Sequence, residues 1–411
     1  MPVYCGIDWA TGHHDVALID ETGALLAKAR ITDDAPGLAT LLAMLAEHGD
    51  HAADPIPVAI ETSRGLLVAA LRTSGRPVYA INPMAAARYR ERTAVTRKKS
   101  DHLDAMALAG ILRTDRDMHR RLPADTELAR AVAVLARAQQ DAVWDRTQAA
   151  NKLRSHLREY FPSFLAAFGD AERFTGRAAR TILAAAPTPA LAQRLTPGKL
   201  RTLLTRAGRQ RGIDAEAARV HAVLATPQMR QPPLVEDAMG QKTKALLRQL
   251  DAACASADEL ERDATASFNQ HPDAEIYLSF PGLGPLLGAR VLAEIGDDRT
   301  RFADARGLKA YAGAAPLTRA SGKTLSVRLR RVKNDRLAAA GYMWSLSSLG
   351  SSPGARAHYD QRRETGDWNA TALRHLNNKL LGCLHHCLHA AVPYSEATAF
   401  PTTGNNLELT A

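Results

Sequence analysis

Four acidic residues in the first part of the chain constrain it most. Asp8 sits in the short apolar run VYCGIDWA, Glu61 closes the run PIPVAIET, and Asp101 and Asp104 begin the segment KKSDHLDAMALAGIL. Because Asp101 and Asp104 are three residues apart, a helix places them on one face. Two carboxylates at strand ends and two on a helix can converge on a pair of divalent cations, which stabilise the attacking and leaving oxygens of a phosphodiester. Ligands that are all oxygen favour Mg²⁺ or Mn²⁺ over zinc.

The order of the expected elements agrees with this placement of the acids. Alternating apolar patterns predict three strands in residues 1–30, and helices and strands then alternate. The expected helices are at 36–48, in RGLLVAALRTSG and at 101–113, and the expected strands are PIPVAIE and PVYAINP. This is the order of an RNase H-like (RuvC-like) mixed sheet, in which the first strand, the fourth strand and a later helix carry the acids. We therefore predict an α/β domain over residues 1–125.

Each acid also has a simpler structural explanation. Asp8 is in a position where an aspartate commonly serves as a turn or cap residue. Asp101 follows Ser100 and could occupy the first helical turn, where the helix dipole favours an anion. Glu61 is the hardest to explain in this way, because an apolar strand that ends in Glu-Thr buries a charge unless something pairs with it.

The remainder of the chain is predicted to be mostly helical. Residues 126–270 form a helical, coiled-coil region, since Leu247, Leu250, Cys254 and Ala257 recur at intervals of three and four residues. Its Ala-rich middle, 170–239, suits a dimerisation arm, a nucleic-acid clamp or a plain helical spacer.

Residues 271–395 form the predicted C-terminal domain, and 396–411 a disordered tail. Near the start of this C-terminal domain, the segment SFPGLGPLLGARVLAEIG resembles a helix-hairpin-helix element, whose helix N-terminus can hold a phosphate. An ordinary helix and turn also fits this segment. Cys383 and Cys387, with His386 and His389, have a spacing that permits a metal site, but LLGCLHHCLHAAV is better explained as a packed helix.

Charge favours a polyanionic partner. The chain has 53 Lys plus Arg against 43 Asp plus Glu, a net charge of +10. Two basic stretches, 88–99 and 319–336, border the candidate chemistry, as expected where phosphates bind. The residues predicted to contact nucleic acid are Arg97, Lys98, Lys99, Arg319, Lys323, Arg328, Arg330, Arg331 and Lys333. With no signal peptide, no membrane span and only four cysteines, the expected location is the cytoplasm, without a membrane partner.

Ser321 is a different kind of candidate. It lies in APLTRASGKTLSVRLRRVKND, flanked by Arg319, Gly322 and Lys323. A serine that attacks a phosphodiester needs cations for the transition-state charge and a flexible neighbour. On chemistry alone, a turn serine that contacts phosphate explains the pattern better, and Ser326 would serve as well.

Several motifs together resemble the DEDD transposases of bacterial insertion sequences, which are bridge-RNA-guided recombinases. GIDWATGHHDVALID, VAIETSRG, AINPMAAARYR and KKSDHLDAMALA are similar to the RuvC-like domain of that family. SFPGLGPLLGARVLAEIGD, RFADARGLKAYAGAAPLTRASGK and SSPGARAHYDQRR resemble its C-terminal transposase domain.

The resemblance implies that Asp8, Glu61, Asp101 and Asp104 bind divalent metal, and that Ser321 forms a transient phosphoserine link to DNA. It implies element-end and target DNA as substrates, a structured guide (bridge) RNA as partner, and dimers that assemble into a tetramer with composite active sites. It also implies association with the nucleoid. One departure is that the family's usual Lys-Gly-Asn turn reads Lys333-Asn334-Asp335 here.

Three alternatives remain open on sequence. A junction resolvase or RNase would use the same acids with water and would not need Ser321. An actin-like sugar kinase has a similar opening, but Trp9 and His13 replace the small residues expected around its phosphate. A non-catalytic nucleic-acid scaffold would bind DNA or RNA without a response to metal.

Overall fold

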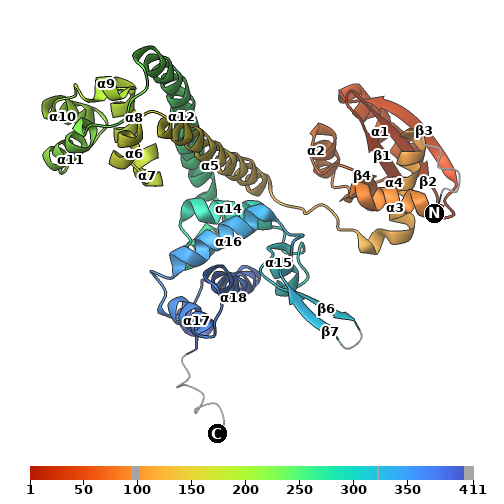
Figure 1. Ribbon diagram of the computed structural model, residues 1–411. Coiled ribbons are helices and arrows are strands. Elements are labelled where there is room, and N and C mark those ends of the chain that lie inside the picture. Colours follow the sequence, from red (N-terminus) through yellow and green to blue (C-terminus); the bar gives the residue numbers. More distant parts are fainter. Residues whose placement is uncertain (94–100, 322–323, 402–411) are drawn as a thin grey trace, which may run out of the picture. The chain divides into compact units, whose positions relative to one another are not determined.

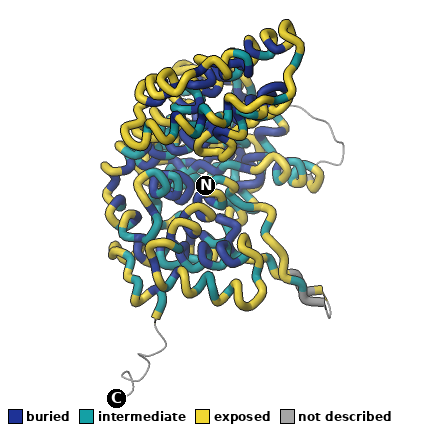
Figure 2. Tube along the Cα trace, turned by 60° about the vertical axis from the view of Figure 1, so that its left-hand side comes forward, coloured by how far each residue is buried: buried dark blue, intermediate teal, exposed yellow. Residues whose placement is uncertain are grey.

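The computed structural model describes residues 1–93, 101–321 and 324–401. They fall into two compact units, Met1–Ala124 and Asp125–Ala411 (Figure 1). Within them, buried residues line the inward sides of the elements and exposed residues the outward sides (Figure 2). No helix in the described ranges is both long and apolar enough to span a bilayer.

The first unit is built on a five-stranded mixed sheet in the order β3-β2-β1-β4-β5. The first three strands form an antiparallel meander, and β4 and β5 run parallel to β1. Their bounds are β1 Tyr4–Trp9, β2 His13–Ile19, β3 Leu25–Thr32, β4 Val58–Ile60 and β5 Val78–Ala80. The predicted mixed α/β sheet with a mostly helical remainder is confirmed.

Helices cover both faces of this sheet. On one face, α1 (Ala35–Glu47) and α2 (Leu66–Thr73) bury Ile7, Ile60 and their neighbours in an aliphatic core. On the other face lie α3 (Pro83–Thr93) and α4 (Asp101–Asp115), followed by the short turn η1 (Arg116–Met118). Ala59 packs there with Leu108, Ile111 and Leu112 of α4.

Gly6 allows α4 to lie directly on β1. A Cβ atom at this position would come 2.0 Å from the carbonyl oxygen of Ala105 and 2.5 Å from the amide nitrogen of Ala109. Both atoms belong to the backbone, so they cannot move aside like a flexible side chain. The distance between helix and strand therefore depends on the absence of a side chain at Gly6.

The second unit begins with two long antiparallel helices, α5 (Glu127–Arg158) and α12 (Pro233–Phe268), which lie side by side in Figure 1. His156, near the end of α5, places its Nε2 atom 3.0 Å from the carbonyl oxygen of Met239, near the start of α12. The four residues of the predicted seam on α12 are all buried.

A small helical bundle is inserted between α5 and α12. It comprises α6 Pro162–Ala167, α7 Ala171–Thr175, α8 Arg177–Ala185, α9 Pro189–Ala192, α10 Pro197–Arg206 and α11 Ile213–Ala225. Aromatic residues fill its core, among them Phe161, Phe164 and Phe174, which are fully buried. Three of these helices, α6, α9 and α10, begin with a proline. Proline suits the first turn of a helix, because the N–H that it lacks would have no partner within the helix.

The C-terminal part is helical except for one hairpin. Its helices are α13 Ala274–Leu278, α14 Pro285–Ile295, α15 Ala305–Tyr311, α16 Asp335–Ser348, α17 Pro353–Glu364, α18 Asn369–Ala390 and α19 Glu396–Ala399. Trp344 is fully buried in their common core and donates its indole N–H to the carbonyl oxygen of Pro281 at 3.1 Å. The hairpin pairs β6 (Leu317–Ser321) with β7 (Thr324–Arg328), which the helical expectation did not include.

The prediction of a disordered tail from residue 396 is wrong for its first residues. Glu396 begins α19 and accepts hydrogen bonds from the Ser352 hydroxyl at 2.7 Å and the Gly354 amide at 2.8 Å. Burial raises its carboxyl pKa, but hydrogen bonds to the charged form outweigh this, so the pKa of Glu396 is lowered. The rest of that prediction, 402–411, lies outside the described residues.

Gly6→Ala is expected to destabilise the first unit, because the added methyl group overlaps the backbone of α4. Forcing an extra methyl into a packed core costs about 1–3 kcal/mol. Hydrogen–deuterium exchange should show faster exchange in peptides from β1 and α4. Gly284→Ala is the control, since nothing lies within 4 Å of its added Cβ. Unchanged protection in the Gly6 variant would contradict this contact.

Candidate active site

Asp8 and Glu61 are neighbours at one end of the sheet. In the parallel pair of β1 and β4, Ile7 lies opposite Ile60. Asp8 and Glu61 are the next residues along each strand direction, so both directly follow the last registered pair of β1 and β4. The sequence placed both acids near strand ends, and the register now adds that the two strands are adjacent.

Both acids face the side of the sheet that α4 covers. Side chains alternate along a strand, so a residue two positions after Gly6 or Ala59 lies on the same face. Gly6 lies under α4, and Ala59 packs against it. Asp8 and Glu61 therefore face the helix that carries the other two acids.

Asp104 precedes Ala105, the residue of α4 that lies over Gly6. It is buried, with 7% of its surface exposed, and its Oδ1 atom is 2.5 Å from Nη1 of Arg90 on α3. Asp101 is the first residue of α4, three positions earlier, so helical geometry places the two on one face. The side chain of Asp101 lies outside the described residues.

The side chains described here do not form a complete metal site. Among them, no group of three or more His, Cys, Asp or Glu is close enough to hold an ion. The donor chemistry nevertheless suits a hard cation, because Asp8, Glu61 and Asp104 offer only carboxylate oxygens. In addition, the buried carboxylate of Asp104 already pairs with the Arg90 guanidinium, so its surroundings tolerate a positive charge next to this carboxylate.

Asp15 extends the row of acids, and the sequence analysis missed it. On the antiparallel side of β1, Asp8 lies opposite Asp15, and Asp15 lies opposite Arg30 of β3. Arg30 donates to Asp15 from Nε at 3.2 Å and from Nη2 at 2.8 Å. Arg30, Asp15 and Asp8 thus occupy successive positions across β3, β2 and β1, and Glu61 directly follows β4. Alternation in HHDVALI could have set Asp15 apart from the core, but only the strand register identifies its partners.

Ser321 is exposed at the end of β6, where it pairs with Thr324 of β7. The intervening Gly322 and Lys323 lie outside the described residues, as do Arg97, Lys98 and Lys99 and the side chain of Arg319. Arg328 and Arg331 are exposed, and Arg330 is half-buried. The predicted basic segment therefore forms the second strand of the hairpin and the connection to α16.

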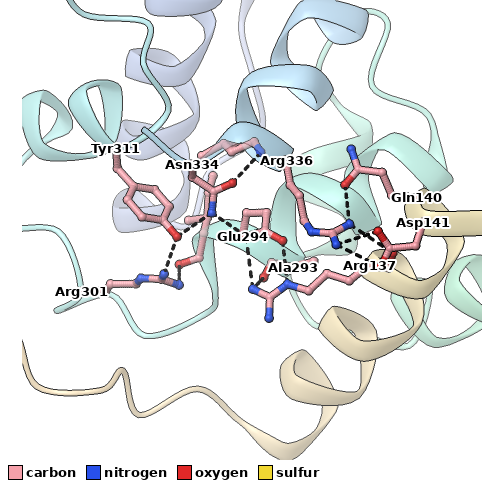
Figure 3. A network of polar contacts seen from close by, with 11 residues as sticks. Arg137, Gln140, Asp141, Ala293, Glu294, Arg301, Tyr311, Asn334 and Arg336 are labelled. Atoms are coloured by element: carbon pink, nitrogen blue, oxygen red, sulfur yellow. Dashed lines mark hydrogen bonds and ion pairs between the residues drawn. The ribbon is translucent and has the colours of Figure 1, made fainter. Parts of the chain in front are cut away.

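Some basic residues in this segment already form ion pairs with carboxylates of the same chain. Lys333 Nζ is 2.5 Å from Asp335 Oδ1. Arg336 donates to Asp141 at 2.7 and 3.0 Å and lies over the ring of Trp144 (Figure 3 shows the Asp141 contacts). Counting basic residues in the sequence overstated the charge that these two positions offer to phosphates.

A polar network holds the start of α16, the helix that follows the hairpin in the chain (Figure 3). Asn334 caps this helix by accepting from the Leu337 amide at 2.8 Å, and its Nδ2 donates to Glu294 at 2.6 Å and to the Tyr311 hydroxyl at 2.7 Å. The turn Lys333-Asn334-Asp335 requires no glycine here, because Asn334 has a φ angle of −78°. The sequence did not identify this network, since its members come from four separate helices or their ends.

Glu294 is the buried charge in this network, and Arg137 of α5 compensates it. Arg137 Nε donates to Glu294 Oε1 at 2.7 Å. Burial works against the charge of Arg137, but the hydrogen bond and charge of Glu294 raise its pKa above the ordinary value. This pair connects α5 to α14 and, through Asn334, to α16.

Comparisons with known proteins agree with the motifs. Residues 5–162 match a family described as "Transposase", and residues 274–360 match the "Transposase IS116/IS110/IS902 family". The chain is 60% identical over 401 residues to the IS117 mini-circle protein of Streptomyces coelicolor, covering 97% of both chains. The chain belongs to the IS116/IS110/IS902 family of transposases. It is an insertion-sequence transposase, an enzyme that acts on DNA.

More distant relatives are similar over nearly the same length. The 42 kDa protein of insertion element IS900 from Mycobacterium paratuberculosis is 28% identical over 414 residues, with 97% of this chain and 98% of that protein covered. The 44.8 kDa protein of insertion element IS116 from Streptomyces clavuligerus is 28% identical over 399 residues, with 93% of each covered. The similarity thus includes both units of this transposase.

Arg137→Met is expected to lower the free energy of unfolding by roughly 2–3 kcal/mol. The change leaves the Glu294 carboxylate buried without its cation. Removing one partner of a fully buried ion pair costs about 3–5 kcal/mol, and the loss expected here is smaller because solvent screens the partly exposed Arg137. Urea denaturation followed by circular dichroism measures the loss. Arg201→Met is the control, since Arg201 forms an exposed pair with Asp214. Equal destabilisation by the two changes would refute a special role for the Arg137–Glu294 pair.

Proposed function

We propose that the first unit is an RNase H-like (RuvC-like) domain whose carboxylates hold Mg²⁺ or Mn²⁺ for DNA cleavage. The residues that would bind the metal are Asp8, Glu61, Asp101 and Asp104. The observation that carries this proposal is the register of β1 and β4, which pairs Ile7 with Ile60, the residues that immediately precede Asp8 and Glu61. Asp104 belongs to α4, the helix that covers the face of the sheet on which both acids lie. Bound divalent metal would stabilise charge on the oxygens of the reacting phosphodiester.

Ser321 supplies the nucleophile in this proposal. Its Oγ atom forms a bond to phosphorus while the bond to the leaving deoxyribose oxygen breaks, and the serine proton ends on that leaving oxygen. Attack by a hydroxyl of a second DNA end reverses these changes and religates the strand. Ser321 is exposed at the end of β6, and Arg319 and Lys323 flank it in the sequence, which supports this role because nearby cations offset the charge of the transition state.

The partners follow from the same family properties. Element-end and target DNA are the substrates, and a structured guide (bridge) RNA selects them by base pairing. Protomers assemble as a dimer and then a tetramer through the helical middle region. A net charge of +10 and the exposed Arg328 and Arg331 support binding to polyanions.

Ser321→Ala is expected to abolish the covalent protein–DNA adduct without loss of the fold, because the side chain is exposed. Denaturing gel electrophoresis with end-labelled element DNA measures the adduct. Ser326→Ala is the matched control, since Ser326 lies on β7 of the same hairpin. An adduct that persists in the Ser321 variant would assign the nucleophile to another residue. Normal cleavage without an adduct would instead support a nuclease that uses water.

Asp104→Asn is expected to reduce metal-dependent cleavage at least about 100-fold, since even groups behind a metal ligand contribute roughly 10–100-fold. Cleavage of labelled DNA over a series of Mg²⁺ and Mn²⁺ concentrations measures the effect. Asp115→Asn on the same helix is the control, because Asp115 forms a partly exposed pair with Arg92. Full activity of the Asp104 variant at ordinary metal concentrations would remove Asp104 from the site.

The family assignment sets aside two alternatives from the sequence. A sugar kinase is excluded because the similarity to transposases extends over 97% of the chain. A non-catalytic scaffold is excluded because the family is enzymatic. The water-using nuclease remains, and the Ser321 experiment separates it from the recombinase.

A further inference from the structure

The inserted helical bundle contains a basic pocket that shares no residue with the proposed active site. Its volume is about 410 Å³, and it lies between α8, α10 and α12. The lining residues that matter here are Arg177, Arg180, Thr181, Ala184, Arg206 and Asp251. Three of them are cations and one is an anion.

Arg180 neutralises the single carboxylate. Its Nη1 atom is 2.5 Å from Asp251 Oδ1, and its Nε atom donates to the carbonyl oxygen of Thr175 at 2.9 Å. Only 16% of the Arg180 side chain is exposed. The pair therefore forms a fixed side of the pocket with no net charge. Asp251 does not neutralise the other two arginines, because Arg180 already compensates its charge.

Arg177 and Arg206 carry the remaining charge. Both are exposed, and neither forms an ion pair with a carboxylate in the described part of the chain. Arg177 is the first residue of α8, and Arg206 is the last residue of α10. Two helix ends thus bring two uncompensated guanidinium groups to one concavity.

The helices that present these arginines are firmly packed. On α8, Ala179, Ile182 and Leu183 are buried in the bundle core, and on α10, Leu200 and Leu204 are buried. The pocket residues of α8 therefore lie on its opposite face. A ligand would meet cations whose backbone is already ordered, which lowers the entropic cost of binding.

The chemistry of the pocket fits a phosphodiester. Arginine binds phosphate through two parallel N–H groups, and the Thr181 hydroxyl adds a second kind of donor. Ala184 keeps the wall small enough for a polymer backbone to approach. Charge and small residues of this kind offer no apolar enclosure for a drug-like molecule. They also offer little that distinguishes one base from another.

We propose that this pocket, formed by Arg177, Thr181 and Arg206, binds a backbone phosphate of nucleic acid without regard to sequence. Such contacts fix the position of a nucleic acid on a protein. The inserted bundle then acts as a clamp that positions nucleic acid, rather than as a plain spacer between α5 and α12. The proposal requires that this transposase binds nucleic acid, and it does not depend on Ser321 or on the metal ligands.

The test measures the salt dependence of binding by the full chain. Fluorescence anisotropy with labelled duplex DNA and with single-stranded RNA gives the slope of log K against log salt concentration. Each phosphate contact contributes about 0.9 to the slope on duplex DNA and about 0.7 on a single strand. The double variant R177Q/R206Q is expected to lose about 0.9 units of slope on duplex DNA or about 0.7 units on single-stranded RNA, the value for one phosphate. The ligand that shows the loss identifies whether the phosphate belongs to DNA or RNA.

A charge-matched control separates a site from general electrostatics. R173Q/R201Q also removes two exposed arginines from the bundle, but these two are paired with Asp170 and Asp214. Its slope is expected to stay unchanged, and R177K/R206K should retain most of the wild-type slope. Equal losses in both glutamine variants, or no loss in either on DNA and RNA, would overturn the proposal. Circular dichroism melts confirm that each variant is folded. Adduct formation by the R177Q/R206Q variant tests the Ser321 chemistry separately.

Discussion

The contact between β1 and α4 is the constraint on which the candidate active site depends. The backbone of α4 occupies the space that a side chain at position 6 would need, so the backbones of β1 and α4 are in direct contact there. Asp8 is two residues from this contact along β1, and Asp104 adjoins it on α4. Any larger residue at position 6 would move α4 outward and increase the distance between the two acids. A glycine in a central strand, which weakens the strand itself, is thus explained by the position of the helix.

Charge in the first unit is arranged around this contact. Asp15, Asp8 and Glu61 occupy neighbouring positions on one face of the sheet, where like charges repel unless cations compensate them. Arg30 provides one cation at the Asp15 side, and Arg90 provides another at Asp104. In the sequence, Arg30 was visible only as a contributor to net charge, and Arg90 only as a member of the basic stretch 88–99. In the structure they belong to the electrostatics of the site, which means that basic residues near an active site need not contact substrate.

The sequence was sufficient to predict most of the elements and the location of Asp8 and Glu61 near strand ends, because these depend on local patterns. Alternation gave the strands of the mixed sheet, helical spacing gave the long helices, and Asp8 and Glu61 lie at the strand ends where they were expected. Features that depend on register or on distant partners were not predictable. The Asp15–Arg30 pair needs the alignment of β2 with β3, and the Asn334 network needs helices separated by more than a hundred residues. The hairpin β6–β7 was missed because each strand has only five residues, LTRAS and TLSVR, and a pattern that short does not set a strand apart from the basic segment around it.

The pairing of Asp104 with Arg90 has a consequence for metal binding. A divalent cation that takes Asp104 as a ligand must replace a guanidinium group only 2.5 Å away. Breaking a buried ion pair is costly when one partner is left alone, but here Asp104 would gain a stronger cation, and Arg90, about a third exposed, can turn to solvent. The released guanidinium would then lie next to the metal-bound carboxylates, where a DNA phosphate is the natural anion to pair with it. Metal and nucleic acid would therefore favour each other's binding, since each provides a partner for one half of the separated pair.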